Sequence, residues 1–305
     1  MSKLQKEQSK GIVRLHNNFV EAIYSLSVDA KKLLLSIILH IQPDNKIQIT
    51  RKEIMQEIGI DLKNLNPKHR EAIIEELMTK IITIRDKDNP NNNWVKMQLL
   101  MLTKYEDGLL TTSIYPELFP YFKEAQERLF TRFNIQNIKP LTSIHAIRMY
   151  ELAKQFDDTG WREISLEEFK RMMKIEDKYK QVKDLKKRVL EPAKRQINER
   201  TDINIDYELI KQGRRYTKIR LKISKNKQRV ERKENKRLIE NGNFAELETK
   251  LNKQYKGKAI KGDDGLTWYV NRIKVLNEKE AEIEITNLSD TKKIVKKIEE
   301  LKKIF

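Results

Sequence analysis

Residues 179–190 read Tyr179-Lys-Gln-Val-Lys-Asp-Leu-Lys-Lys-Arg-Val-Leu190 and continue with helical apolar spacing to Ile197. Two alternating segments follow, Ile203-Asn-Ile-Asp-Tyr207 and Tyr216-Thr-Lys-Ile-Arg-Leu-Lys-Ile223, with Gly213 between them. This alternation is typical of half-buried strands, so the sequence predicts a helix and then a hairpin. Residues 178–227 carry 17 lysines and arginines against six acidic residues, and therefore supply most of the +18 formal net charge of the 305-residue chain.

A basic helix followed by a basic hairpin is the arrangement of a winged helix, in which the helix enters a DNA major groove and the hairpin lies along the phosphates. Within residues 180–195, the apolar side chains Val182, Leu185, Val189 and Ala193 share one face. The alternative for lysines on the other face is simple solvation, but the cations of the adjoining hairpin favour one continuous DNA-binding surface. The candidate DNA-contacting residues of this surface are Lys180, Gln181, Lys183, Lys186, Lys187, Arg188, Lys194, Arg214, Arg215 and Lys218.

The composition points to a polyanionic partner. The pI is about 9.7, and nucleic acid is the leading candidate, with an anionic membrane surface as the competing interpretation. No apolar run reaches the roughly 18 residues that a membrane span needs, and residues 1–10 are polar. There is no cysteine and hence no disulfide or thiolate site. We expect a cytoplasmic protein that does not enter a membrane.

The pattern of the first 136 residues predicts a first winged helix. Ser27 can cap a helix over 28–41, residues 47–49 alternate as a strand, and Thr50 with Glu53 fits a capping box that starts a short helix. Asn66-Pro67 starts the next helix. Strands are then predicted over 81–85, 94–102 and 109–115.

The same order returns after a linker at residues 137–140. A helix is predicted over 143–156, a strand over 161–164, and a second capping box at Ser165 and Glu168. Thr50 and Ser165 lie 115 positions apart, and the same offset relates Ile58 to Met173. Several features at one offset favour a duplicated unit, although any two helix-rich domains share caps and apolar spacing.

The remaining chain differs in composition. The domain boundaries that we predict are 1–136 and 141–228 for two winged helices, 229–258 for a charged linker helix, and 259–305 for a small β-rich module. That module is expected to end in a helix over 291–303. The fold class is therefore α+β, with two tandem winged-helix domains and a small β-rich C-terminal appendage.

Catalysis has little support in the sequence. The four histidines, His16, His40, His69 and His145, share no metal-ligand spacing, and the chain contains neither a His-x-His pair nor a G-x-x-x-x-G-K-[ST] loop. A rolling-circle nicking enzyme and a P-loop ATPase are both disfavoured for this reason. The paired acids at 263–264 lie in a glycine-flanked turn, which we interpret as a solvated hairpin rather than a cation site. We expect no enzymatic activity, catalytic residue, metal or cofactor.

Several runs of the sequence together form a recognisable pattern. In the second half these runs are Ser143-x-His-Ala-Ile-Arg-Met-Tyr-Glu-Leu152, Ile164-Ser-Leu-Glu-Glu-Phe169, residues 179–188, Ile197-Asn-Glu-Arg-Thr-Asp202 and Gly213-Arg-Arg-Tyr216. In the first half they are Asn18-Phe-Val-Glu-Ala-Ile-Tyr-Ser-Leu26 and Lys31-Lys-Leu-Leu-Leu35. Over roughly residues 14–225 the chain thus resembles iteron-binding plasmid replication initiators of the Rep type 3 superfamily. At Lys183, Lys186 and Lys187 the family often has arginine or proline, and lysine lacks the planar fork that reads guanine, so phosphate contact is expected there.

This resemblance implies a function and partners. A monomer would bind direct repeats (iterons) in double-stranded DNA at a plasmid origin, and a dimer paired through the first domain would repress its own promoter. Host replication proteins, such as the host initiator and helicase, would be recruited in the bacterial cytoplasm. The alternative function is a winged-helix transcription regulator without a replication role.

The first domain is expected to divide its role between DNA contact and self-association. Its helix from Pro67 carries Lys68 and Arg70 as candidate DNA contacts, but three glutamates follow at 71, 75 and 76. The apolar segment 33–38 exceeds what one helix face needs. It therefore either packs on all sides inside the domain or supplies a surface for pairing with a second copy.

Overall fold

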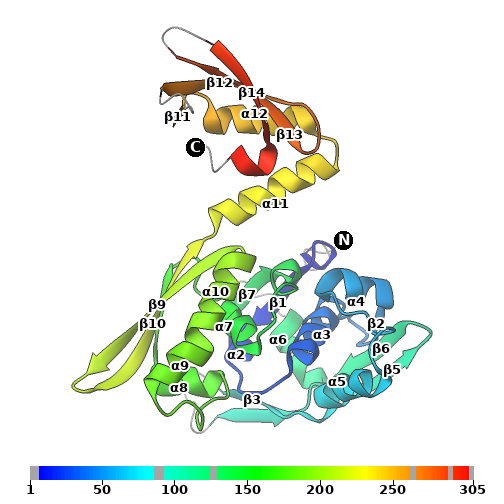
Figure 1. Cartoon of the computed structure of the whole chain (residues 1–305). Helices are drawn as coiled ribbons and strands as arrows, with labels where there is room; N and C mark the ends of the chain where they lie inside the picture. Colours follow the sequence, from blue (N-terminus) through cyan, green and yellow to red (C-terminus); the bar gives the residue numbers. More distant parts are fainter. Residues whose placement is uncertain (1–6, 86–92, 124–128, 262–265, 288–290, 302–305) are drawn as a thin grey trace. The chain divides into compact units, whose positions relative to one another are not determined.

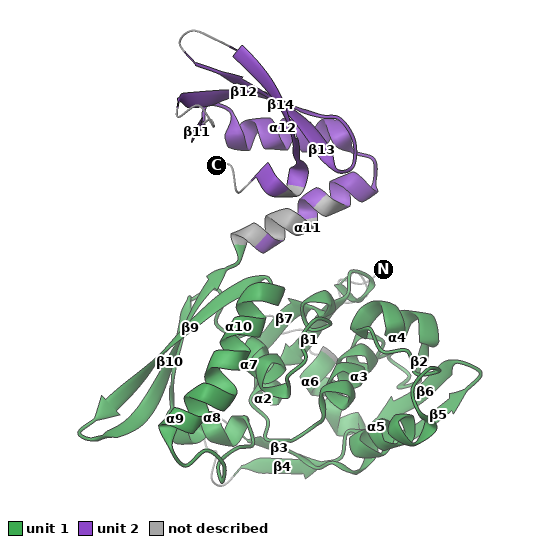
Figure 2. Ribbon diagram, in the orientation of Figure 1, with its two compact units in different colours: residues 1–226 green, residues 227–305 purple. Residues whose placement is uncertain are grey.

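A computed structural model describes residues 7–85, 93–123, 129–261, 266–287 and 291–301. The chain divides into two compact units, Met1–Asn226 and Lys227–Phe305 (Figure 2). The acidic pair at 263–264 and the polar turn at 86–92 lie outside the described residues.

The first half of unit 1 is a winged helix with two additional strand pairs (Figure 1). Its main sheet has the strand order β2-β6-β5. In addition β3 pairs with β4, and β1 pairs with β7. All of these pairings are antiparallel. Its elements are β1 (Ile12–His16), α2 (Asn17–Val20), α3 (Val28–Leu39), β2 (Ile47–Thr50), α4 (Arg51–Ile58), α5 (Pro67–Thr79), β3 (Ile82–Arg85), β4 (Trp94–Met97), β5 (Leu100–Glu106), β6 (Leu109–Ile114), α6 (Phe119–Lys123) and β7 (Phe130–Asn134).

The predicted helix starts of this half are confirmed, although the helix predicted over 28–41 ends at Leu39. The Ser27 side chain caps α3, and Thr50 with Glu53 forms both hydrogen bonds of a capping box on α4. Gly59 ends α4 with φ +75°, a left-handed conformation that glycine adopts without a Cβ penalty. Pro67 is the first residue of α5 after the Asn66 cap.

The second half of unit 1 repeats this order. Its elements are α7 (Ile144–Lys154), β8 (Trp161–Ser165), α8 (Leu166–Met172), α9 (Val182–Leu185), a π-helical turn (Lys186–Leu190), α10 (Glu191–Arg200), β9 (Ile203–Gln212) and β10 (Arg215–Lys225). The strand order β8-β10-β9 matches β2-β6-β5. Ser165 caps α8 by accepting from the Glu168 N–H group, but the predicted return hydrogen bond from Ser165 N to the Glu168 side chain, which would complete a capping box as on α4, is not formed. The repeated topology agrees with the 115-residue offset of the sequence pattern.

The predicted continuous helix from Tyr179 differs in the structure. It begins at Val182, because Tyr179 has φ +51° and Gln181 an extended backbone. A π-helical turn then precedes Pro192, which has no N–H to donate to the carbonyl group of Arg188. We refer to Val182–Arg200 as the recognition segment.

The predicted strand over 94–102 is wrong as a single element. The structure has two strands there, and they belong to different sheets: Trp94–Met97 pairs with β3, whereas Leu100–Glu106 pairs with β6. The break between Met97 and Leu100 redirects the chain, and Leu99 is fully buried at this position.

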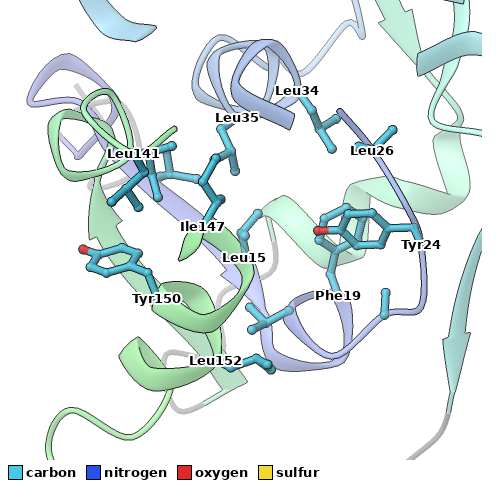
Figure 3. Close-up of a cluster of buried hydrophobic side chains, with 14 of the residues drawn as sticks. Leu15, Phe19, Tyr24, Leu26, Leu34, Leu35, Leu141, Ile147, Tyr150 and Leu152 are labelled. Atoms are coloured by element: carbon cyan, nitrogen blue, oxygen red, sulfur yellow. The ribbon is translucent and has the colours of Figure 1, made fainter. Parts of the chain in front are cut away.

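One hydrophobic core runs through both halves of unit 1. The cluster of Figure 3 contains Leu15 and Leu35 from the first half and Ile147 and Leu152 from α7, all essentially inaccessible to solvent. The apolar segment of α3 is also buried, Leu33 and Leu34 included. Packing on all sides is therefore the correct interpretation of residues 33–38, and they supply no surface for a second copy in this structure.

Unit 2 is a four-stranded antiparallel sheet with the order β11-β12-β13-β14, packed against a helix. Its elements are α11 (Lys227–Glu240), α12 (Phe244–Tyr255), β11 (Ala259–Lys261), β12 (Thr267–Val275), β13 (Glu280–Thr286) and β14 (Thr291–Lys297). Two helices thus replace the single linker helix predicted over 229–258. Gly242, with φ +66°, lies in the turn between them.

The helix predicted over 291–303 is wrong in its described part. Residues Thr291–Lys297 form β14, and only Ile298–Glu300 form a short 3-10 helix. Pairing along the whole of β13, with Ile294 opposite Ile283, decides the structure of this segment.

Candidate nucleic-acid interface

The first part of the recognition segment carries a group of exposed cations. Lys183, Lys186, Lys187 and Arg188 are exposed, and none of them forms an ion pair with a residue that the structure describes. The apolar face that holds the segment on the core is the predicted one, since Leu185, Val189 and Ala193 are fully buried. These four side chains are therefore available for a polyanion.

Two candidates precede the segment instead of lying in it. Lys180 is exposed in the loop, and the exposed Gln181 is the residue before the first helical turn. Lys170 donates a hydrogen bond to the carbonyl oxygen of Tyr179 at 3.0 Å, which holds this loop at the start of the helix. Both candidates still lie at the end of the helix that usually meets base edges.

Lys194 has a partner inside the protein. Its Nζ lies 2.7 Å from Oδ1 of Asp206 on β9, and the side chain is about one third exposed. The hydrogen bond from Lys194 lowers the pKa of the Asp206 carboxyl group below its ordinary value. Lys194 thus differs from the cations at 183–188, because a phosphate would have to compete with Asp206.

The β9–β10 hairpin, which we call the second wing, ends in a cluster of cations. Arg214 and Arg215 are exposed at its tip beside Gly213, which has φ +63° and no other atom within 4 Å of an added Cβ. Lys211 is opposite Tyr216 in the strand register, with its Nζ 4.9 Å from the ring centroid. Lys211 was not among the predicted site residues, although its position two residues before Gly213 was a usable signal.

The base of the second wing is internally neutralised. Lys218 and Arg220 both bind the carboxylate of Glu163 on β8, at 2.8 Å and 2.7 Å. These hydrogen bonds lower the pKa of Glu163. In this structure Lys218 therefore links β10 to β8 through Glu163. Arg214 and Arg215 at the tip have no such carboxylate partner among the described residues.

The candidates of the first winged helix are weaker. Lys68 is exposed in the first turn of α5, but Arg70 donates to the carbonyl oxygen of Leu62 at 3.2 Å and lies 5.0 Å from the Tyr105 ring centroid. The β5–β6 hairpin, the first wing, turns at Glu106-Asp107-Gly108 and is acidic at its tip. The two wings thus have opposite charge, and the second is the one suited to phosphates.

Other kinds of site have no support among the described residues. Over that part of the chain, no group of three or more histidine, aspartate or glutamate side chains could hold a metal ion. None of the described helices is long and apolar enough to cross a membrane. The cations of the recognition segment and the second wing are therefore the candidate functional site.

The sequence of this chain matches models of a known protein family. Two family models match, "Initiator Replication protein, WH1" over residues 12–154 and "Initiator Rep protein, WH2" over residues 165–223. A replication initiation protein of Escherichia coli is 26% identical over 220 residues, which cover 68% of this chain and 67% of the relative.

A solved structure shares the fold. The crystal structure of the Pi initiator protein in complex with iteron DNA matches with a TM-score of 0.55 and 18% identity, over 70% of this chain and 97% of the other. The two family models together match most of the chain and cover both winged helices. The chain belongs to the Rep type 3 family of initiator replication proteins, with winged-helix domains WH1 and WH2.

Proposed function

We propose that this protein initiates plasmid replication by binding direct repeats, or iterons, in the duplex DNA of the origin. The observation that carries the proposal is the cluster of exposed cations at Lys183, Lys186, Lys187 and Arg188, which have no acidic partner among the described residues. Family membership and the shared fold of the Pi initiator, which was crystallised with iteron DNA, support the same assignment.

The two winged helices divide the work. The recognition segment and the tip of the second wing neutralise phosphates, and release of counterions supplies most of the affinity. Sequence is read at the start of the segment, near Gln181, because base edges and not phosphates carry identity. The first domain contributes through Lys68 at the start of α5, with an acidic first wing that limits its own phosphate contact.

The proposal extends to self-association through the first domain, with the dimer repressing the initiator's own promoter. The surface that we assign to it is β5, an edge strand on which Met101 is 48% and Leu102 62% exposed. A second copy pairing along this edge would cover both side chains and satisfy free backbone groups. Leu102→Glu is expected to abolish dimerisation in sedimentation equilibrium, and Leu276→Glu in unit 2, where the side chain is 46% exposed, serves as the matched control.

Replication distinguishes this function from that of a transcription regulator. The gene and its flanking DNA, joined to a selectable marker without another origin, are expected to be maintained in a bacterial host. Lys186→Ala with Lys187→Ala should abolish maintenance while the protein accumulates normally. Repression of the promoter without maintenance would favour the regulator. The site acts in the cytoplasm on plasmid DNA, and the host's own initiator and helicase are the partners that it would recruit.

A further inference from the structure

Four polar side chains are buried together where the two winged helices of unit 1 meet. Lys31 on α3 and Glu151 on α7 are fully inaccessible, and Arg148 on α7 is only 2% exposed. Tyr24, in the loop before α3, completes the group at 4% exposed. We call these residues the charged junction.

The junction bonds the two halves directly. Lys31 Nζ lies 2.7 Å from Glu151 Oε1 and donates to Tyr24 Oη at 2.6 Å. Arg148 donates to Tyr24 Oη at 2.8 Å and to the carbonyl oxygen of Ala22 at 2.8 Å, both in the first half. It also contacts Glu151 at 3.1 Å. Two cations from two different helices therefore share one carboxylate and one hydroxyl group.

Each helix of the junction supports a helix that we assign to DNA contact. Helix α3 packs against α5, and α7 packs against α10 of the recognition segment. The two helices that we assign to DNA contact, α5 and α10, are therefore connected through α3 and α7, and the Lys31–Glu151 ion pair joins α3 to α7. Movement at the junction would change the distance and the angle between α5 and the recognition segment.

An apolar junction would hold these helices together equally well. Burying ions costs desolvation energy that their attraction only partly offsets, and apolar replacements of similar volume are often as stable or more stable. Charged pairs add directionality, because their hydrogen bonds form only in a narrow range of geometries, whereas apolar attraction is non-directional. The two halves also share an apolar cluster, which includes Leu35 and Ile147 (Figure 3).

We propose that the charged junction sets the spacing of the DNA repeat that this initiator accepts, with Lys31 and Tyr24 as positioning residues that do not touch DNA. The inference rests on the proposed function, since it assumes that both winged helices bind one repeat. One inserted base pair moves a half-site by about 3.4 Å along the axis and rotates it by about 35°. A rigid junction cannot follow both changes, and a loosened one can.

Lys31→Met is the sharpest variant for this test. It removes one of two cations and leaves the Arg148–Glu151 pair balanced, so no lone buried charge is created. Tyr24→Phe is a milder second variant that removes only the hydroxyl group. Lys154→Met is the matched control, because Lys154 is also a largely buried lysine on a helix of the junction, but it pairs with Asp157 and with Asp202 at 3.4 Å, both in the second half.

The full chain first selects its duplex from a random-sequence library, and footprinting locates the two patches that it protects. The measurement is then the affinity for this duplex with zero or one base pair inserted between the two patches. Linking two binding modules multiplies affinity by on the order of 100-fold or more. The wild type and Lys154→Met are therefore expected to lose about that factor on the insertion. The Lys31→Met variant must be folded by circular dichroism and unfold cooperatively on heating, and its affinity should then fall less than about 10-fold on the insertion. The loss of affinity for Tyr24→Phe should lie between those of Lys31→Met and the wild type.

Two outcomes would overturn the inference. In the first, folded Lys31→Met and Tyr24→Phe show the same loss as the wild type. In the second, the wild type tolerates the insertion. Failure of the proposed function is distinguishable from both, because the wild type would then select no repeat with two protected patches from the library.

Discussion

Lys194 on α10 and Asp206 on β9 form an ion pair with 2.7 Å between Nζ and Oδ1, which joins the recognition segment to the second wing. The exposed lysines about two to three turns earlier have no such partner among the described residues. This difference separates two roles within one basic surface: holding the wing at the helix, and binding phosphate. The first three predictions follow from it.

Replacing Lys186 and Lys187 with alanine should abolish specific binding while folding is retained, because both side chains are exposed. The slope of log affinity against log salt should fall by about one for each phosphate that the variant no longer neutralises. Salt-titrated fluorescence anisotropy measures it, with Lys296→Ala and Lys297→Ala on β14 as exposed control lysines. An unchanged slope in the recognition-segment variant would place these lysines on a solvated face.

Lys194→Met should behave differently. Affinity should fall because the wing loses its tie to α10, but the salt slope should stay near that of the wild type, since the variant still neutralises the same phosphates. The same anisotropy titration decides the matter. A slope reduced by about one would show that Lys194 leaves Asp206 to bind a phosphate.

Replacing Arg214 and Arg215 with alanine should weaken specific and non-specific binding by similar factors. Both side chains project from the exposed tip of the second wing and can reach the phosphates, which carry no base identity. Competition between the selected duplex and a random duplex measures both affinities. A loss confined to the selected duplex would mean that the wing reads bases.

The pH dependence of stability should show a contribution from His40. Burial lowers the pKa of this imidazole, but the hydrogen bond and charge of Glu57, at 2.7 Å, outweigh burial and raise it above 6.5. A raised pKa means that the stabilisation is fully present below pH 6.5 and is lost as the pH rises through the folded-state value. Denaturant unfolding across this range should therefore show falling stability, and His40→Gln should flatten the curve.

His145 provides the control of opposite sign. Burial and then the charge of Lys178 lower its pKa below 6.5, so its contribution is present above pH 6.5 and lost as the pH falls through the folded-state value. His145→Gln should change only the acid side of the curve. If His40→Gln changed nothing above pH 6.5, the His40–Glu57 pair would not be a stabilising one.

Local patterns predicted much of unit 1. The caps at Ser27, Thr50 and Ser165 were readable because side-chain oxygens satisfy helix N–H groups in a fixed local geometry. Strand pairing was not readable in the same way. The split after Met97 and the strand at Thr291–Lys297 depend on partners elsewhere in the chain, which apolar spacing does not reveal.

The sequence predicted that the candidate site is a basic surface, but not which of its cations form ion pairs within the protein. Exposed cations and the apolar stripe of the recognition segment followed from spacing, whereas the carboxylates that occupy Lys194 and Lys218 could not be inferred. The charged junction was missed altogether, because its partners at 31 and 151 are brought together only by the tertiary fold. A signal did exist: Lys31 and Lys32 directly precede the apolar run Leu33–Leu35 of α3.

Footprinting on the DNA that flanks the gene tests the central claim most directly. Two winged helices that each enter a major groove on one face of the duplex predict protection of about 20 base pairs per site. The account predicts direct repeats of this length, each protected in two patches, and loss of protection in the Lys186→Ala, Lys187→Ala variant. Uniform protection without repeats, or protection that survives in that variant, would contradict it.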